Sequence, residues 1–274
     1  MKPTYLVPTD FTDAANTALR HAVNTAEFSN AELSVVHLCK STKEIVSAKK
    51  KLDDWIGSIA PNVEIVPLVR VGDFKDIAVT AKEVSAEMIF MGTHGAVGLQ
   101  KIKGSNALKL VTNSTIPFVI VQKDSNVSDE GGYKTILATI SHNRESKQKV
   151  KAVIAIAKYF GSKVILLYKD EKDDDLRIDT ATNLVFVKKQ LDAEGIKYDV
   201  KLSTGKNFNE DTINAAKKYN VDLITIMNMQ MNTILGTGLL GPNYEQEILM
   251  NTANIPVMIV SPTQNTKFGN VTMM

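Results

Sequence analysis

The chain is short of the features that mark several large classes of protein. Cys39 is the single cysteine among 274 residues, so an internal disulfide is excluded and a reducing compartment is expected. No apolar run approaches the roughly 18 residues that a membrane helix requires. The N-terminus lacks the long apolar segment of a signal peptide. These absences predict a cytoplasmic protein with no membrane partner.

An excess of charge of one sign is also missing. Lysine and arginine number 32 against 30 aspartates and glutamates, a net charge of +2, and the two signs are mixed along the chain. Binding to nucleic acid needs a basic face or stripe, so no nucleic-acid partner is expected. The chain does have 44 % apolar and 23 % charged residues, which is ordinary for a globular protein with a real core. Its length fits one large domain or two smaller ones.

Short apolar runs alternate with helical patterns through the first 122 residues. Strands are expected at 4–9, 31–39, 62–72, 87–92 and 116–122, and helices around 15–26, 43–59, 76–84 and 106–113. Strands that alternate with helices predict a parallel sheet covered by helices on both faces. The fold class is therefore α/β.

The same series begins again after a polar segment, residues 123–133, which is the best candidate for a linker. The segment YKTILATIS in the second half corresponds to TYLVPTDF in the first, and NIPVMIVS corresponds to TIPFVIVQ. This repeat predicts two related domains, residues 1–124 and 132–264, arranged as a pseudo-twofold pair. Their last strands, Phe118 to Val121 and Val257 to Val260, are apolar edges that would invite aggregation if left open, so we expect them to pair with each other.

A glycine-rich stretch, MGTHGAVGLQKIKGSN, follows the fourth expected strand at residues 91–106. In an open parallel sheet, ligands bind beyond the carboxyl ends of the strands, where the strand order reverses. Gly92 and Gly95 let backbone N–H groups turn toward an anion, and Gly104-Ser105 opens an expected helix whose N-terminus favours negative charge. A flexible surface turn followed by a capped helix explains the same glycines, and the glycines alone do not decide between the two.

Asp10 belongs to the same edge of the expected sheet, because it follows the first strand in VPTDF. Taken alone, it is better explained as the N-cap of the next helix than as a ligand contact. Gly72 ends the third strand at this edge and is, by itself, an ordinary strand-to-helix turn.

Together these residues resemble the universal stress protein family. The shared features are Gly-x-x-Gly, a spacer and Gly-Ser after the fourth strand, with Pro-Thr-Asp after the first. The chain is similar to the tandem form of the family, and the resemblance covers about residues 3–122 and 133–262. It implies two doubly wound domains of the adenine-nucleotide α-hydrolase-like kind, each a five-stranded parallel sheet flanked by helices. Many members bind ATP through this motif; the spacer here, residues 96–103, is one residue shorter than the family's.

The resemblance also implies which residues contact the nucleotide. Those around the phosphates and ribose would be Gly92, His94, Gly95, Gly104, Ser105 and Asn106. Those along the adenosine would be Pro8, Thr9 and Asp10, with Leu38 and Met91 beside the base. A Mg²⁺ ion that bridges the phosphates would be within reach of Asp10 and Asp73, a weaker expectation.

The second copy departs from this pattern. In the sequence comparison Asn228 stands at the position of Gly92, Met231 at that of Gly95 and Ile140 at that of Asp10, while Pro242 and Asn243 fall near the Gly-Ser pair. Residues 236–241, GTGLLG, spell a dinucleotide fingerprint, but it lies after a fourth strand rather than a first, so we interpret it as a chance match. The second domain is therefore not expected to hold ATP in the family manner.

The sequence thus favours a stress-response sensor or regulator that binds ATP or another adenine nucleotide in its first domain. Two alternatives stay open, a nucleotide-independent scaffold that serves dimerisation and a slow ATP hydrolase; a homodimer is compatible with each. No general base, nucleophile arrangement or metal-ligand cluster is evident in the sequence. His21 is expected on a helix surface, and residues 169–175, KDEKDDD, are expected to form a solvated loop.

Overall fold

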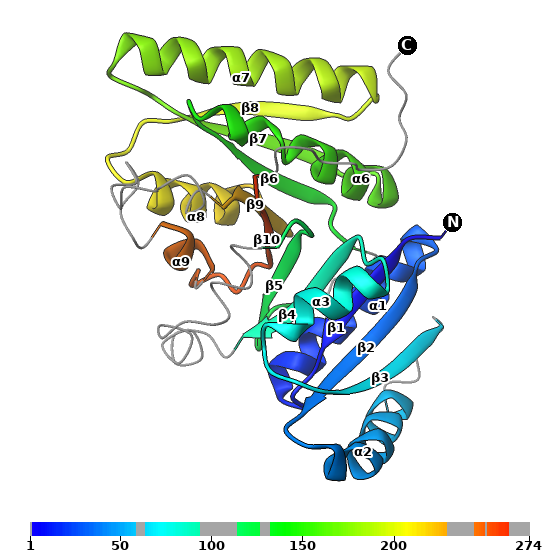
Figure 1. Ribbon diagram of the computed structural model, residues 1–274. Helices are drawn as coiled ribbons and strands as arrows, with labels where there is room; N and C mark the ends of the chain where they lie inside the picture. The colour runs from blue at the N-terminus through cyan, green and yellow to red at the C-terminus, as the bar shows by residue number, and fades with distance from the viewer. Residues whose placement is uncertain are drawn as a thin grey trace.

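The computed structural model describes residues 2–58, 64–93, 114–126, 132–228, 244–249 and 251–262. Its strands form one continuous sheet in the order β3-β2-β1-β4-β5-β10-β9-β6-β7-β8 (Figure 1). The first half of the chain contributes β1 (Thr4–Pro8), β2 (Glu32–Cys39), β3 (Ile65–Val71), β4 (Met88–Thr93) and β5 (Phe118–Gln122). The second half contributes β6 (Thr135–Ile140), β7 (Lys163–Lys169), β8 (Tyr198–Ser203), β9 (Leu223–Met227) and β10 (Val257–Val260).

The two halves are related by a pseudo-twofold axis at the centre of this sheet. Strands within each half run parallel, whereas β5 and β10 pair antiparallel. Val119 faces Met258, and on either side Phe118 pairs with Ile259 and Ile120 with Val257. The predicted pairing of the two terminal strands is confirmed, and with it the doubly wound, pseudo-twofold α/β fold.

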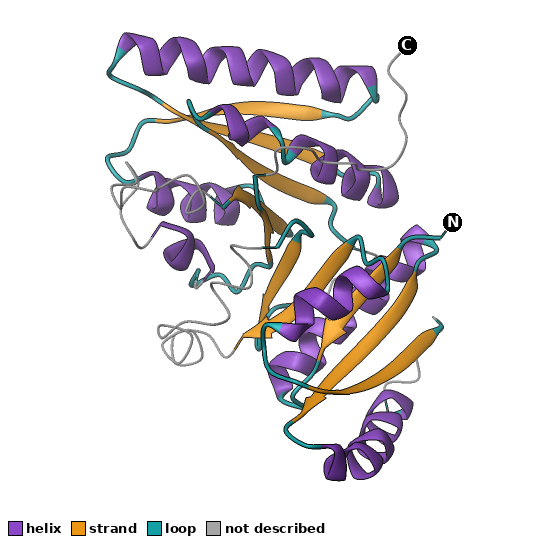
Figure 2. Ribbon diagram, in the orientation of Figure 1, coloured by secondary structure: helices purple, strands orange, loops and turns teal. Residues whose placement is uncertain are grey.

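Helices cover both faces of the sheet, as the parallel strand order requires (Figure 2). One face packs against α1 (Asp13–Ser29), α2 (Ile45–Gly57), α6 (Val150–Phe160) and α7 (Asp174–Ala193). The other packs against α3 (Asp76–Glu83), α8 (Phe208–Lys218) and α9 (Tyr244–Leu249). Short 3₁₀ turns precede α2 and α6, η1 at Thr42–Glu44 and η2 at Arg144–Lys147. The helix expected at 106–113 lies outside the described residues.

Alternating side chains along each strand supply the two cores, because successive residues of a strand point to opposite faces. In β4, for example, Phe90 lies in the cluster on the α1 face and Met91 in the cluster on the α3 face. Both faces are buried, so the central strands read as continuous apolar runs. Proline is tolerated at Pro67 because β3 is an outermost strand of the sheet.

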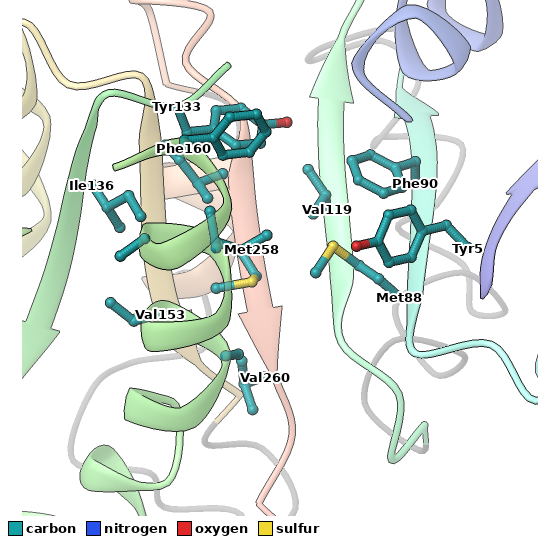
Figure 3. Close-up of a cluster of buried hydrophobic side chains, with 14 of the residues drawn as sticks. Tyr5, Met88, Phe90, Val119, Tyr133, Ile136, Val153, Phe160, Met258 and Val260 are labelled. Carbon is teal, nitrogen blue, oxygen red and sulfur yellow. The ribbon is translucent and has the colours of Figure 1, made fainter. Parts of the chain in front are cut away.

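Aromatic side chains join the halves on the α1 face. Phe28 of α1 lies 5.0 Å from Phe160 of α6 between ring centroids, and Tyr133, just before β6, meets Phe160 edge-on at 5.4 Å. Figure 3 shows Tyr133 and Phe160 in contact at one end of the shared cluster, with Met258 and Val119 on β10 and β5. The core is thus continuous across the pseudo-twofold axis.

Candidate functional site

The strand order reverses between β1 and β4 in the first half. From β1 the chain builds outward through β2 to β3 and then returns to the other side of β1 to form β4 and β5. The carboxyl ends of neighbouring strands at such a reversal leave a crevice where α/β proteins bind ligands. Six of the residues implied by the family resemblance lie at the carboxyl ends of β1, β2 and β4, which are adjacent: Pro8, Thr9, Asp10, Leu38, Met91 and Gly92.

The turn after β1 is held by short side-chain contacts. Thr9 Oγ1 accepts a hydrogen bond from the backbone N–H of Phe11 at 3.0 Å. Asp10 Oδ1 accepts two, from the N–H of Thr12 at 3.1 Å and from its hydroxyl at 2.6 Å. Thr12, not Asp10, is the N-cap of α1, since Thr12 Oγ1 accepts from the N–H of Ala15. Asp10 supports the cap from one step further back and remains exposed at the edge of the sheet.

Phe11 forms an aromatic cluster beside Asp10 that the sequence interpretation missed. Its ring lies 4.5 Å from the His37 ring and 5.9 Å from Trp55, and Lys51 Nζ stands 4.1 Å from its centroid. Phe11 has φ = 64°, a left-handed conformation that non-glycine residues adopt at a cost and that gathers at functional sites. His37 Nδ1 is bonded to the Thr9 carbonyl at 2.8 Å, which fixes the ring. The only signal in the sequence was an aromatic residue directly after Pro-Thr-Asp.

Gly92 is close to the backbone of α1. A Cβ atom at Gly92 would lie 2.2 Å from the Ala14 carbonyl oxygen and 2.7 Å from the Ala15 nitrogen. These atoms belong to the first turn of the helix, so they cannot move aside without displacing α1. Gly92 is therefore required by helix–strand packing, whether or not its amide also faces a ligand.

The side chains of Leu38 and Met91 lie on the face of the sheet that packs against α3, opposite the face covered by α1. Met91 is buried in the cluster that includes α3, and Leu38 is partly buried against the same cluster. The two side chains thus provide an apolar wall at the edge formed by β2, β1 and β4. The remaining implied residues, His94, Gly95, Gly104, Ser105 and Asn106, lie outside the described residues.

The second half lacks the same arrangement at its own reversal point, between β6 and β9. Leu6 pairs with Ile89 and, correspondingly, Leu137 pairs with Ile224, so Ser141 is the structural counterpart of Asp10. Gly92 pairs with Val121 and Met227 with Val260, which makes Met227 the counterpart of Gly92. Both matches correct the sequence comparison, which assigned Ile140 and Asn228, by one residue.

In the first half the first turn of α1 packs against Gly92, whereas in the second half a side chain occupies the equivalent position. Met227 is buried in the core on the α6 face, and the η2 turn precedes α6. Asn183 of α7 ties down the loop after β6, since its Nδ2 donates to the carbonyls of Ser141, His142 and Asn143 at 2.9, 3.2 and 2.9 Å. Lys149 is 2 % exposed beside this loop, and burial lowers the pKa of its amine to about 7.

Of two expectations about titratable residues, the one for His21 was wrong and the one for residues 169–175 holds for most of the segment but not for Glu171. His21 is not on a helix surface: it is 3 % exposed, because it points from α1 toward Tyr133, with Nδ1 3.1 Å from the phenol oxygen. The acidic segment 169–175 is only partly solvated. Glu171 is 7 % exposed and contacts His142 and Lys169 at 3.3 and 3.4 Å, while Asp173 caps α7. Charge runs predict exposure only where no neighbouring element offers partners.

The parts of the chain that the structure describes hold no cluster of three or more potential metal ligands. Asp73 accepts a hydrogen bond from the N–H of Lys75 at 3.0 Å, which anchors the turn before α3. A separate search for membrane spans within the described ranges found no helix with the length and apolarity to cross a bilayer.

Comparison with known proteins agrees with this architecture. Residues 3–122 match the model of the universal stress protein family. A universal stress protein of Methanocaldococcus jannaschii is 27 % identical over an alignment of 143 residues, and the match covers 43 % of this chain and 81 % of that protein.

Solved structures extend the likeness in fold to the whole chain. A universal stress protein from Archaeoglobus fulgidus has a TM-score of 0.72 at 15 % identity and covers 97 % of this chain and 98 % of its own. A putative one from Pseudomonas aeruginosa has a TM-score of 0.64 at 13 % identity, covering 94 % and 93 %. Residues 3–122 thus match the universal stress protein family in sequence, and the ten-stranded sheet of the chain is similar in fold to solved universal stress proteins.

Proposed function

We propose that the chain binds ATP or another adenine nucleotide in its first domain, residues 1–124, and acts as a stress-response sensor or regulator rather than a fast enzyme. The observation that supports this is the convergence of Pro8, Thr9, Asp10, Leu38, Met91 and Gly92 at the point where the strand order reverses. The edge combines an exposed carboxylate, an apolar wall and an aromatic cluster, which suits the ribose hydroxyls and the flat base of a nucleoside.

Each residue has a proposed role. Pro8, Thr9 and Asp10 edge the adenosine, and Leu38 and Met91 lie against the base. The residues proposed around the phosphates and ribose are Gly92, His94, Gly95, Gly104, Ser105 and Asn106. Lys51, above the Phe11 ring, places a positive charge beside the same edge. Since ATP is held with Mg²⁺ in many sites, Asp10 and Asp73 are the carboxylates to examine for metal dependence.

The second domain, residues 132–264, is proposed to hold no nucleotide in this manner. Ser141 offers a hydroxyl where Asp10 offers a carboxylate, and the buried Met227 side chain stands where Gly92 has none. Its role is to complete the sheet through β10. Association of whole chains into a homodimer stays a prediction.

Nucleotide binding is tested by heating the purified protein and identifying released nucleotides by mass spectrometry, followed by calorimetry with ATP, with and without Mg²⁺. We expect ATP or another adenine nucleotide in the released fraction. Gly95→Val should abolish binding, because a branched side chain would occupy the phosphate space. Asp10→Ala should weaken binding by about 1–2 kcal/mol, while its matched control in the second half, Ser141→Ala, should leave it unchanged.

Two results would count against the proposal. If wild-type protein neither releases nor binds an adenine nucleotide, the result favours the alternative of a nucleotide-independent scaffold. Equal affinities for wild type, Gly95→Val and Asp10→Ala would return the glycine-rich loop to an ordinary turn.

A further inference from the structure

Phe11 is the one bulky side chain on left-handed backbone among the residues that the structure describes, with φ = 64°. The other non-glycine residues with positive φ are small and polar, and each closes a helix or a turn: Asn30, Ser85, Asn220 and Asn254. Such residues tolerate this conformation, whereas a phenylalanine in it is an outlier that persists only where its surroundings hold it. The contacts of Phe11 therefore need an explanation of their own.

Three side chains hold the Phe11 ring. The His37 ring lies 4.5 Å from it between centroids, and Trp55 meets it edge-on at 5.9 Å. Lys51 Nζ stands 4.1 Å from the ring centroid. Aromatic pairs and cation–π contacts at these distances are favourable. They offset the cost of a left-handed backbone that asparagine or glycine would adopt readily.

The two aromatic partners of the ring are fixed in turn by other elements. A carbonyl oxygen can only accept, so His37 Nδ1 on β2 donates to the Thr9 carbonyl, at 2.8 Å. Trp55 Nε1 on α2 donates to Asn16 Oδ1 on α1, at 2.6 Å. The ring is therefore packed against side chains whose positions are set by β2, α1 and α2.

The backbone turn at Phe11 carries two of the proposed adenosine contacts. Thr9 Oγ1 accepts from the N–H of Phe11 at 3.0 Å. Asp10 Oδ1 accepts from the N–H and the hydroxyl of Thr12, at 3.1 and 2.6 Å. The bonds to Thr12 span Phe11, so the direction of the Asp10 carboxylate depends on the conformation of residue 11. A different φ at this residue would break them.

We propose that Phe11 is a positioning residue of the first-half nucleotide site, where its ring holds Thr9 and Asp10 in place for adenosine. The inference rests on the proposed function. Phe11 acts through its neighbours, and His37 and Trp55 support it from outside the motif. Since Thr9 and Asp10 are proposed to edge the adenosine, the ring matters for adenosine and not for the phosphates.

The experiment compares variants of the full chain. Phe11→Asn and Phe11→Gly each remove the ring but adopt left-handed backbone readily, whereas Phe11→Tyr keeps the ring. Ser85→Asn is the matched control, since Ser85 has φ = 53° and precedes the amino end of β4, away from the proposed site. Each variant is titrated with adenosine, AMP and ATP by calorimetry, and Phe11→Asn is also combined with Asp10→Ala. Circular dichroism verifies that each variant is folded.

We expect Phe11→Asn and Phe11→Gly to weaken the binding of adenosine, AMP and ATP by the same factor, about tenfold. Phe11→Tyr and Ser85→Asn should stay within about twofold of wild type. The combined variant should bind about as weakly as the weaker of its two single variants, because the ring acts through Asp10. Without nucleotide, the Thr12 amide, which donates to Asp10, should exchange its hydrogen faster in Phe11→Asn than in wild type.

The inference is overturned if the variants without the ring retain full affinity, if Phe11→Tyr loses as much affinity as they do, or if the losses of Phe11→Asn and Asp10→Ala add in the combined variant. Unchanged hydrogen exchange at Thr12 overturns it independently of any ligand. If wild type binds none of the three compounds, the proposed function fails and the inference fails with it. If wild type binds them and Phe11→Asn binds them equally well, the inference alone fails.

Discussion

At the scale of single residues, Gly92 illustrates how a glycine in a motif proposed to bind a ligand can be needed by the fold itself. Its missing side chain leaves room for the first turn of α1. A loss of ligand binding after substitution at Gly92 would therefore not by itself identify a ligand contact. For this reason Gly95, rather than Gly92, is the position to substitute in the nucleotide experiment.

We predict that Gly92→Ala lowers the free energy of unfolding by about 2–3 kcal/mol, because the new methyl group would press on the helix backbone. The matched control is Gly57→Ala at the end of α2, where nothing lies within 4 Å of the added Cβ. That control should be neutral or slightly stabilising, since alanine is the better helix former. Denaturant unfolding measures both, and a Gly92→Ala variant as stable as the control would contradict the packing argument.

A second prediction at this scale concerns His21. Its pKa is about 4 in the folded protein and near 6.5 when unfolded, so protonation favours the unfolded chain. The contribution of neutral His21 is complete above pH 6.5 and is lost as the pH falls toward 4. As the pH falls from 7 to 5, protonation of His21 in the unfolded chain should lower the free energy of unfolding by about 2 kcal/mol.

The measurement is the free energy of unfolding at several pH values for wild type, His21→Phe and Tyr133→Phe. The loss below pH 6.5 should be reduced in His21→Phe, which cannot titrate, and should persist in Tyr133→Phe, which keeps the imidazole buried. An identical pH slope in wild type and His21→Phe would show that His21 is not the titrating group.

At the scale of elements, the loops after β1 and β6 show how equivalent connections are stabilised by different means. After β1, Thr9, Asp10 and Thr12 satisfy one another locally and lead directly into α1. After β6, the loop depends on Asn183 of the distant helix α7. The first loop is therefore fixed by its own sequence, and the second by tertiary contact.

Accordingly, Asn183→Leu should lower the free energy of unfolding by about 2–3 kcal/mol. It removes the amide that donates to three carbonyl groups, and leucine offers them no replacement donor. Thr182→Ala, one position earlier in α7 and exposed, should cost less than about 0.5 kcal/mol. Hydrogen exchange should locate the loss of protection around residues 141–143. Equal stabilities for the two variants would mean that the loop after β6 does not depend on Asn183.

At the scale of the whole molecule, the pairing of β5 with β10 joins the two halves of the chain in one sheet. The edge strands that would otherwise be open are satisfied by each other, and their side chains enter cores shared by both halves (Figure 3). Gly132 at the junction, with φ = 81°, fits only because it has no Cβ, which would meet the Phe160 ring at 1.9 Å.

The shared sheet and core predict that a destabilising substitution in one half also lowers the stability of the other half. Trp55, the single tryptophan, reports on the first half, whereas Met258 belongs to the second. Met258→Ala should cost about 2–4 kcal/mol and lower the unfolding midpoint followed by Trp55 fluorescence by the same amount as that followed by circular dichroism. Val185→Ala, on the exposed side of α7, is the control and should shift neither. A Trp55 midpoint that ignores Met258→Ala would show that the halves unfold separately.

Much of the fold could be predicted from the sequence, because its determinants are local. Apolar runs buried on both faces predict parallel strands, and their repetition predicts two copies. The pairing of β5 with β10 was also predictable, since two apolar edge strands are protected from solvent when they pair with each other. The six described residues at the reversal point were found from a motif, and their meeting follows from the parallel order alone.

Only the tertiary structure determined the features that depend on contacts between elements far apart in the sequence. The pattern of α1 gave no sign that His21 would be covered by Tyr133, because Tyr133 comes from a segment more than 100 residues away. The counterparts of Asp10 and Gly92 in the second half shifted by one residue once the hydrogen-bonded register was known. Likewise, the need for glycine at position 92 arises where the first turn of α1 meets β4, from a segment far along the chain. Periodicity encodes which face of an element is apolar, but only the assembled chain determines which atoms that face meets.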